Sequence, residues 1–147
     1  GSGISNSLRA GHFLADEIIK NNSVSVETLW KYQVKYYEKI GAEHFFEDYL
    51  KRTLLYSSDE DIKYVFESGI ITEKDMCNFS SGKGLKFTPQ ELILKLHKCL
   101  KKSNFMITLL SALLKGLKAK NQAMRIPTKY DEEKIKLWQM KVERLFS

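Results

Sequence analysis

The sequence predicts a mainly α-helical fold, and three observations support this. Gly and Pro together are scarce, with eight and two among 147 residues, which disfavours many short strands and turns. Apolar residues recur at spacings of three and four rather than alternating. Three segments begin with Ser or Thr followed three residues later by an acid, a helix-start signature. We therefore expect one domain over residues 1–147, an orthogonal bundle of about seven helices.

The first three helices are predicted from caps and periodicity. The first runs from about Ser5 to Asn21, with Ser5 as its N-cap. The second begins after Ser25 and the third spans roughly residues 42–56, while Gly41 between them either ends a helix or marks a bend. The inward positions given by this spacing are Trp30, Val34, Tyr37, Phe45, Phe46, Tyr49 and Leu50.

Two short helices follow. Ser58 and Asp61 have the spacing of a capping box, and Thr72 and Asp75 repeat it. Gly69 stands just before the second box and predicts the end of the first short helix.

The second half contains a loop and three longer helices. Residues 80–87, with Gly82 and Gly84, are predicted to form the loop. Thr88-Pro89-Gln90-Glu91 combines a cap, a first-turn proline and a reciprocal acid, so a helix should start there. Further helices are expected from Ser103 towards Lys120 and after Pro127. The predicted inward positions are Leu92, Leu96, Cys99 or Leu100, and then Ile135, Trp138, Val142 and Leu145.

Composition and spacing disfavour several functional classes. The net charge is +6, but the lysines alternate with acids along the chain, as on a solvated surface. A nucleic-acid-binding module using the lysines of residues 98–102 and 115–120 stays an alternative, although no helix adds base-reading side chains to them. His12, His44 and His97 lack metal-ligand spacing, and no nucleophile stands near a base. We expect no metal site and no catalytic residue here.

The two cysteines, Cys77 and Cys99, form no C-x-x-C motif. We expect both thiols to be reduced, with Cys99 facing inward as a small apolar residue. A disulfide between them is the alternative if the source is a hyperthermophile, towards which the Lys- and Glu-rich composition leans.

Small side chains recur every fourth residue on the first helix, at Ser7, Gly11 and Ala15. Such a face allows another backbone to approach closely. It packs either within the domain or against a partner outside it, and an exposed face of this kind would favour self-association.

Several segments resemble the geranylgeranyl reductase family, flavoenzymes related to the aromatic hydroxylases. Residues 3–16, GISNSLRAGHFLAD, are similar to the family's Gly-rich turn and following helix. Leu29-Trp30-Lys31-Tyr32-Gln33 resembles the start of the next family helix. Residues 59–62 and 67–72 resemble the short acidic helix and the "GIIT" turn that follow. The resemblance covers the first half of the chain in order and rests on helical character after Ser80.

The resemblance implies that this chain is the C-terminal part of a larger α/β flavoprotein. A missing N-terminal domain would hold the FAD, and residues 1–22 would pack on it while residues 23–147 form a helical cap. The resemblance implies that Gly1, Gly3, Ile4 and Ser5 form a turn close to the flavin. They are not a dinucleotide fingerprint, because Asn6 stands where the third Gly should be and no strand precedes them. The parent protein would saturate double bonds of an isoprenoid or lipid substrate.

Further expectations follow for the chain by itself. We expect it to be inactive alone and to bind no cofactor. We expect a cytoplasmic location, with peripheral membrane contact left open. We expect no nucleic acid as a specific binding partner. A helical protein-interaction domain remains the rival interpretation.

Overall fold

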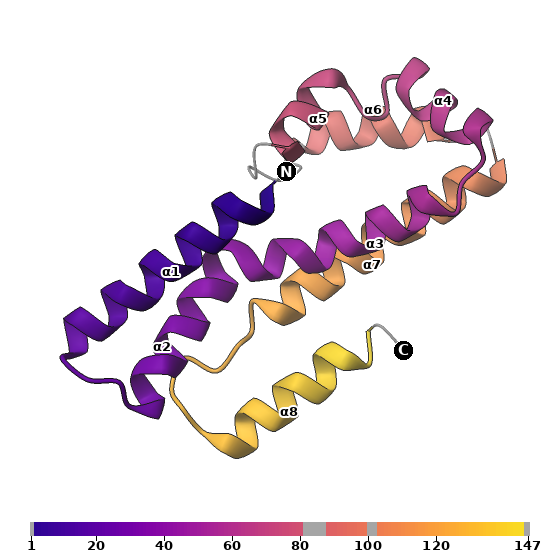
Figure 1. The fold of residues 1–147 in the computed structure, drawn as a ribbon. Coiled ribbons are helices and arrows are strands. Elements are labelled where there is room, and N and C mark those ends of the chain that lie inside the picture. Colours follow the sequence, from indigo (N-terminus) through magenta and orange to yellow (C-terminus); the bar gives the residue numbers. More distant parts are fainter. Residues whose placement is uncertain (1, 81–87, 100–102, 146–147) are drawn as a thin grey trace.

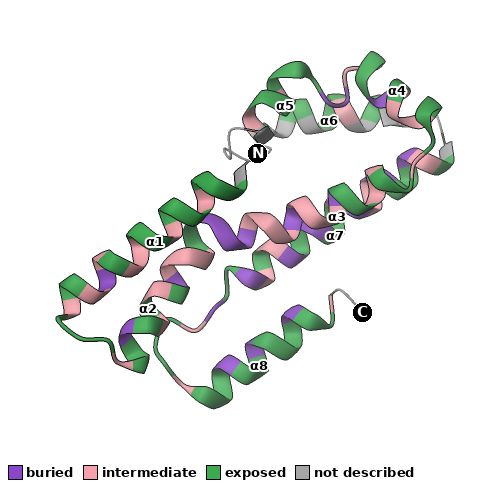
Figure 2. Ribbon diagram, in the orientation of Figure 1, coloured by how far each residue is buried: buried purple, intermediate pink, exposed green. Residues whose placement is uncertain are grey.

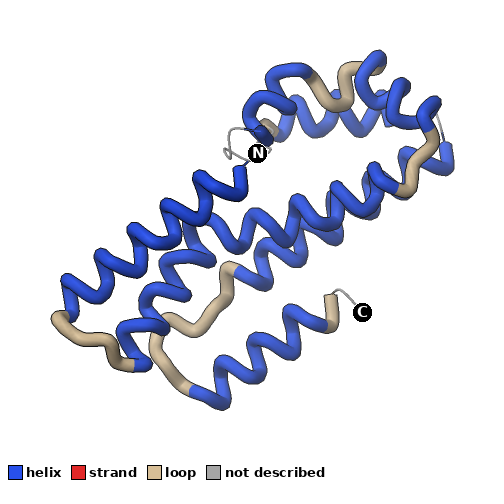
Figure 3. Tube along the Cα trace, viewed as in Figure 1, coloured by secondary structure: helices blue, strands red, loops and turns tan. Residues whose placement is uncertain are grey.

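A computed structural model describes residues 2–80, 88–99 and 103–145. These residues contain helices and their connections but no strand, as Figure 3 shows. The mainly α-helical class is therefore confirmed. Helices α2 and α3 below are joined by η1 without a break in the helical backbone, although the helix axis turns between them (Figure 1), so the described residues make seven helical segments, the number expected from the sequence.

The elements follow one another along the chain in Figure 1. In order they are α1 (Ser2–Asn21), α2 (Val26–Tyr36), the π-helical turn η1 (Tyr37–Gly41), α3 (Ala42–Leu55), α4 (Asp59–Glu67), α5 (Glu73–Ser80), α6 (Pro89–Cys99), α7 (Ser103–Ala123) and α8 (Glu132–Glu143). The predicted 80–87 loop lies outside the described residues except for Ser80, which ends α5.

Helix α1 begins earlier than predicted. It starts at Ser2, so the prediction that Ser5 is an N-cap is wrong. The first N–H groups of any helix lack intrahelical partners, and nothing in the sequence Ser-Gly-Ile-Ser blocks helical backbone angles, so the helix extends to the start of the described chain.

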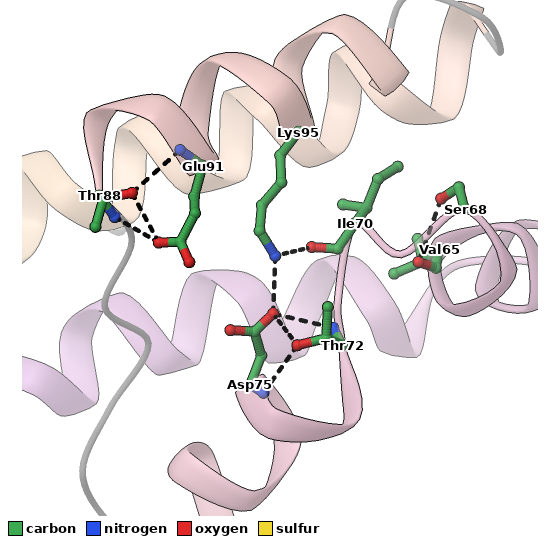
Figure 4. A network of polar contacts seen from close by, with 8 residues as sticks. All are labelled: Val65, Ser68, Ile70, Thr72, Asp75, Thr88, Glu91 and Lys95. Atoms are coloured by element: carbon green, nitrogen blue, oxygen red, sulfur yellow. Dashed lines mark hydrogen bonds and ion pairs between the residues drawn. The ribbon is translucent and has the colours of Figure 1, made fainter.

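The other predicted helix starts and stops are confirmed. Ser25 and Ser58 accept hydrogen bonds from the backbone N–H groups three residues later. The two boxes beginning at Thr72 and Thr88 are closed in both directions by their acids (Figure 4). Gly69 has φ +68°, the left-handed geometry of a helix stop. Helix α8 has a cap that the sequence analysis missed, Asp131, which accepts from the Lys134 N–H.

Gly41 does not end the helix; it belongs to η1, where the helix bends between α2 and α3 (Figure 1), the second of the two predicted alternatives. The backbone passes through η1, an inserted turn of wider π-helix, and continues directly into α3. A Cβ at Gly41 would lie 2.7 Å from Cε1 of Tyr36, so a side chain there would collide with that ring. A larger residue at this turn would therefore force the Tyr36 ring to shift.

Helices α3 and α7 lie side by side in opposite directions and form the centre of the fold (Figure 1). A Cβ at Gly116 would lie 2.9 Å from Cδ2 of Phe46 and 3.2 Å from its carbonyl oxygen, which shows how closely the backbones approach. The core at the α4 end of this pair is aliphatic, and Figure 2 shows its buried stretches. Its members are Leu50, Val65, Ile70, Ile71, Met106 and Leu109.

A second core joins α8 to α2 and η1. Trp138 and Val142 of α8 are buried against Val34, as the sequence stripe predicted, and Ile126 completes the cluster. Trp30, Tyr37 and Phe45 pack around it. The Trp30 indole N–H donates to the Pro127 carbonyl, in the segment between α7 and α8, at 2.7 Å. The Trp138 indole N–H donates to the Gln122 carbonyl, near the end of α7, at 3.1 Å. Buried indoles with satisfied N–H groups orient α8 specifically.

Helices α4, α5 and α6 connect the end of α3 to the start of α7. The Lys95 amino group of α6 donates to the Ile70 carbonyl and, at 2.8 Å, to the Asp75 carboxylate (Figure 4). The two ionic side chains are only 14% and 13% exposed, so this contact holds α6 against α5, and the bond to Ile70 holds it against the turn between α4 and α5. Of the predicted inward residues, Leu92, Leu96 and Cys99 belong to α6 but their side chains are not among those described, and Leu100 lies outside the described residues.

Candidate functional site

The predicted flavin-proximal turn is the first turn of α1. Gly3, Ile4 and Ser5 are helical and exposed, so the prediction of a separate turn before the helix is wrong, while Gly1 lies outside the described residues. A Cβ at Gly3 would meet no atom within 4 Å. A group approaching this end of α1 would therefore meet backbone N–H groups and the positive end of the helix dipole without steric obstruction.

The small-residue face of α1 is exposed rather than packed within the domain. Ser7, Gly11 and Ala15 are all exposed, and a Cβ at Gly11 would meet nothing within 4 Å. Large apolar side chains on the same helix are also open to solvent: Ile4 is 79% exposed, Leu8 71% and Ile19 78%. We call the set Ile4, Ser7, Leu8, Gly11, Ala15 and Ile19 the α1 face.

The opposite side of α1 is fixed to α2 by polar contacts. The Lys35 amino group donates to Asp16 at 3.1 Å, lies 3.6 Å from the Glu17 carboxylate and sits 5.3 Å from the centre of the Phe13 ring. The hydrogen bond from Lys35 to Asp16 raises the pKa of Lys35 above its ordinary value, although burial opposes this. These contacts point the α1 face away from α2.

A groove of about 480 Å³ lies between α3, α4 and α5. Most of its wall is aliphatic, and one edge is formed by polar residues of α3. The lining residues are His44, Glu47, Asp48, Leu50, Lys51, Leu54, Leu55, Ile62, Ile71 and Met76. Nothing in the sequence analysis pointed to this groove, because it exists only once the three helices are packed.

His44 stands at the polar edge of the groove with its ring held on both sides. Nδ1 lies 2.9 Å from the Glu47 carboxylate, and Nε2 lies 3.5 Å from the Asn6 amide nitrogen of α1. The His44 side chain is 41% exposed. Through Asn6, this edge of the groove is adjacent to the N-terminal part of α1.

The structure places the remaining candidate residues apart. His12 on α1 and His97 on α6 are both exposed. Within residues 2–80, 88–99 and 103–145, no three His, Cys, Asp or Glu side chains come close enough to hold a metal ion. No helix in the described part of the chain is long and apolar enough to cross a bilayer.

Comparison of the chain with protein-family models, with curated proteins and with solved structures found no match.

Proposed function

We propose that this chain is the C-terminal helical domain of an FAD-dependent oxidoreductase of the geranylgeranyl reductase type, whose full protein saturates isoprenoid double bonds. The observation that carries the proposal is the α1 face. It is apolar, is built around small residues and lies uncovered on a helix whose other side is fixed. The segment with the resemblance to that family, residues 3–16, includes most of this face.

The α1 face suits a contact with another folded domain. Ser7, Gly11 and Ala15 would let a backbone come close, while Ile4 and Leu8 supply the apolar area that such a contact buries. Burying side chains of this size stabilises a contact by about 1.5–3 kcal/mol each. The proposed occupant is the FAD-binding domain of the same protein.

The residues at the start of α1 fit a supporting role towards FAD. Gly3 offers backbone without a side chain, and the helix end favours the negative charge of a phosphate or a reduced flavin. The chain has no dinucleotide fingerprint, so the binding pocket itself would belong to the other domain. When bound there, the flavin would supply hydride, and this chain would cover the substrate.

The experiment compares the same substitution in two lengths of the protein. Gly11→Leu in the isolated chain should keep the helical circular dichroism and should not lower the thermal midpoint, because nothing occupies the space there and leucine has a higher helix propensity than glycine. In the protein that includes the FAD-binding domain, Gly11→Leu should reduce flavin retention, measured by absorbance after gel filtration. Lys20→Leu, at an exposed position on the same helix, is the matched control and should not reduce flavin retention.

Two results would overturn the proposal. One is a yellow isolated chain that carries stoichiometric flavin, since binding would then not need another domain. The other is a gene whose preceding codons lack a Gly-Asp flavin motif, which would favour the protein-interaction alternative for the same α1 face.

A further inference from the structure

The positive charge of the chain is concentrated in one stretch of the sequence. Residues 92–130 contain nine Lys and Arg and no Asp or Glu, whereas the other 108 residues contain fifteen bases and eighteen acids. The alternation of lysines with acids therefore stops after Glu91 and resumes only at Asp131. The net charge of +6 comes from this stretch, and helix α7 lies within it.

Helix α7 carries an uncovered apolar stripe on the side turned away from α3. Ile107 is 66% exposed, Leu114 60% and Leu117 42%, and Leu110 is partly buried. These four residues recur at spacings of three, four and three, and we call them the α7 stripe. The next position in the same spacing is Asn121, which is also exposed. The spacing is that of the a and d positions of paired helices, where a single Asn fixes the register of the pair.

The charges beside the α7 stripe are positive. Lys115 and Lys118 lie three residues apart on one flank and are exposed. In the described part of the chain neither of them takes part in an ion pair. Lys120, on the other flank, is paired with Glu43 of α3. Helix α8, which also contacts α7, has three acids and three lysines, so it supplies no net negative charge to the two exposed lysines.

The shape of the α7 stripe favours another helix as its partner. A helix that lies on a membrane surface has a broad apolar face, whereas this stripe is a narrow seam with Lys118 directly beside it. A nucleic acid would neutralise the lysines but leave the exposed leucines uncovered. A second copy of α7 would bring no acid to Lys118. In paired helices the charges at the positions flanking the seam decide which partner binds, so these lysines select acids.

We propose that the α7 stripe binds an amphipathic helix of another protein, with apolar residues in heptad spacing flanked by Glu or Asp. The partner's apolar residues cover Ile107, Leu114 and Leu117, and its acids pair with Lys115 and Lys118. The positive net charge of this chain also speeds the encounter with an acidic partner. The inference goes beyond the proposed function and uses a different helix from the α1 face.

The test titrates the chain into a fluorescently labelled peptide of three heptads, the length of α7, with leucine at the a and d positions and glutamate at e and g. Repulsion between the glutamates keeps this peptide from pairing with itself. We expect saturable binding by fluorescence anisotropy, and we expect salt to weaken it. Leu114→Glu should weaken binding at least about tenfold, because it places a charge within the stripe. Leu8→Glu, at an equally open leucine of the α1 face, is the matched control and should leave binding unchanged.

An exchange of charge tests the flank separately. Lys118→Glu should weaken binding of the acidic peptide at least about threefold and strengthen binding of the same peptide with lysine at e and g. Lys20→Glu, at an exposed lysine of α1, controls for the change in net charge. Equal weakening of both peptides by Lys118→Glu would overturn the selection of an acidic partner.

The remaining outcomes decide whether the α7 stripe binds a helix at all. No saturable binding of the acidic peptide, or binding that survives both Leu114→Glu and Ile107→Glu, would overturn the inference. So would binding that Leu8→Glu abolishes and Leu114→Glu does not, since the peptide would then lie on the α1 face. If the peptide does not bind, but Leu114→Glu abolishes sedimentation with phosphatidylserine vesicles or self-association, the stripe belongs to lipid or to a second copy instead. The flavin-retention test at Gly11 is independent of all these results.

Discussion

The close approach of α3 and α7 can be tested by adding one methyl group at two glycines. Gly116→Ala places a Cβ 2.9 Å from Cδ2 of Phe46 and 3.2 Å from its carbonyl oxygen, so the helices must move apart. Gly11→Ala places the same group where no atom lies within 4 Å. Both changes gain the helix propensity of alanine over glycine, about 1 kcal/mol. Overpacking a tight contact costs about 1–3 kcal/mol.

The difference between the two variants isolates the packing cost, because the propensity gain cancels. We expect Gly11→Ala to raise the free energy of unfolding by about 0.5–1 kcal/mol. The free energy of unfolding of Gly116→Ala should lie about 1–3 kcal/mol below that of Gly11→Ala. The assay is urea unfolding followed by helical circular dichroism. In thermal melts, each kcal/mol corresponds to about 2–4 °C for a chain of this size. Equal stabilisation by both alanines would refute the close contact at Gly116.

Three further predictions concern α5 and α6. Lys95→Met should lower the free energy of unfolding by about 1.5–3 kcal/mol in urea, because the Ile70 carbonyl and the Asp75 carboxylate lose their charged donor. Burial raises the pKa of Asp75, but hydrogen bonds from Lys95 and Thr72 outweigh it and hold the pKa below the ordinary value of an aspartate. The stability that the ionised carboxylate contributes is therefore present above about pH 4 and lost below it, so the disadvantage of Asp75→Asn should shrink between about pH 6 and about pH 3. Cys77 is exposed, so intact-mass measurement after native alkylation should show it labelled; two unlabelled sulfurs without reductant would instead indicate the Cys77–Cys99 bridge.

The helices could be predicted from the sequence because their signals are local. Ser58, Thr72 and Thr88 each act on a backbone N–H three residues away, and Gly69 supplies a left-handed angle that other residues rarely adopt. Such signals need no knowledge of the rest of the chain. The missed start of α1 shows the limit, since Ser5 has the chemistry of a cap but the helix continues past it.

The groove and its polar edge could not be predicted, because they depend on distant contacts. His44 meets Asn6 across 38 positions, and Lys95 reaches Asp75 across 20. The pairing of His44 with Glu47 has helical spacing, but the sequence contains many such pairs on solvated faces. The crowding at Gly41 is local in the sequence, but it depends on the rotamers of Tyr36 and Tyr37, which spacing alone does not give.

Helix α1 is attached differently from the rest of the fold, and this leads to a last prediction. Among its described positions only Glu17 is buried, and neither apolar core contains a residue of α1. Its polar contacts with α2 are those of Lys35 with Asp16 and Glu17 and of Lys31 with Asn21, and water and salt weaken the ion pairs among them.

A helix held in this way should open locally more often than the central pair. We expect amide hydrogens of α1 to exchange faster than those of α3 and α7, and to exchange faster still at high salt. Attachment of a domain to the α1 face would bury Leu8 and Ile19 and slow that exchange selectively. Mass-detected hydrogen exchange on the isolated chain and on the protein with its FAD-binding domain measures both effects. Protection of α1 equal to that of α3 in the isolated chain would show that the helix needs no further partner.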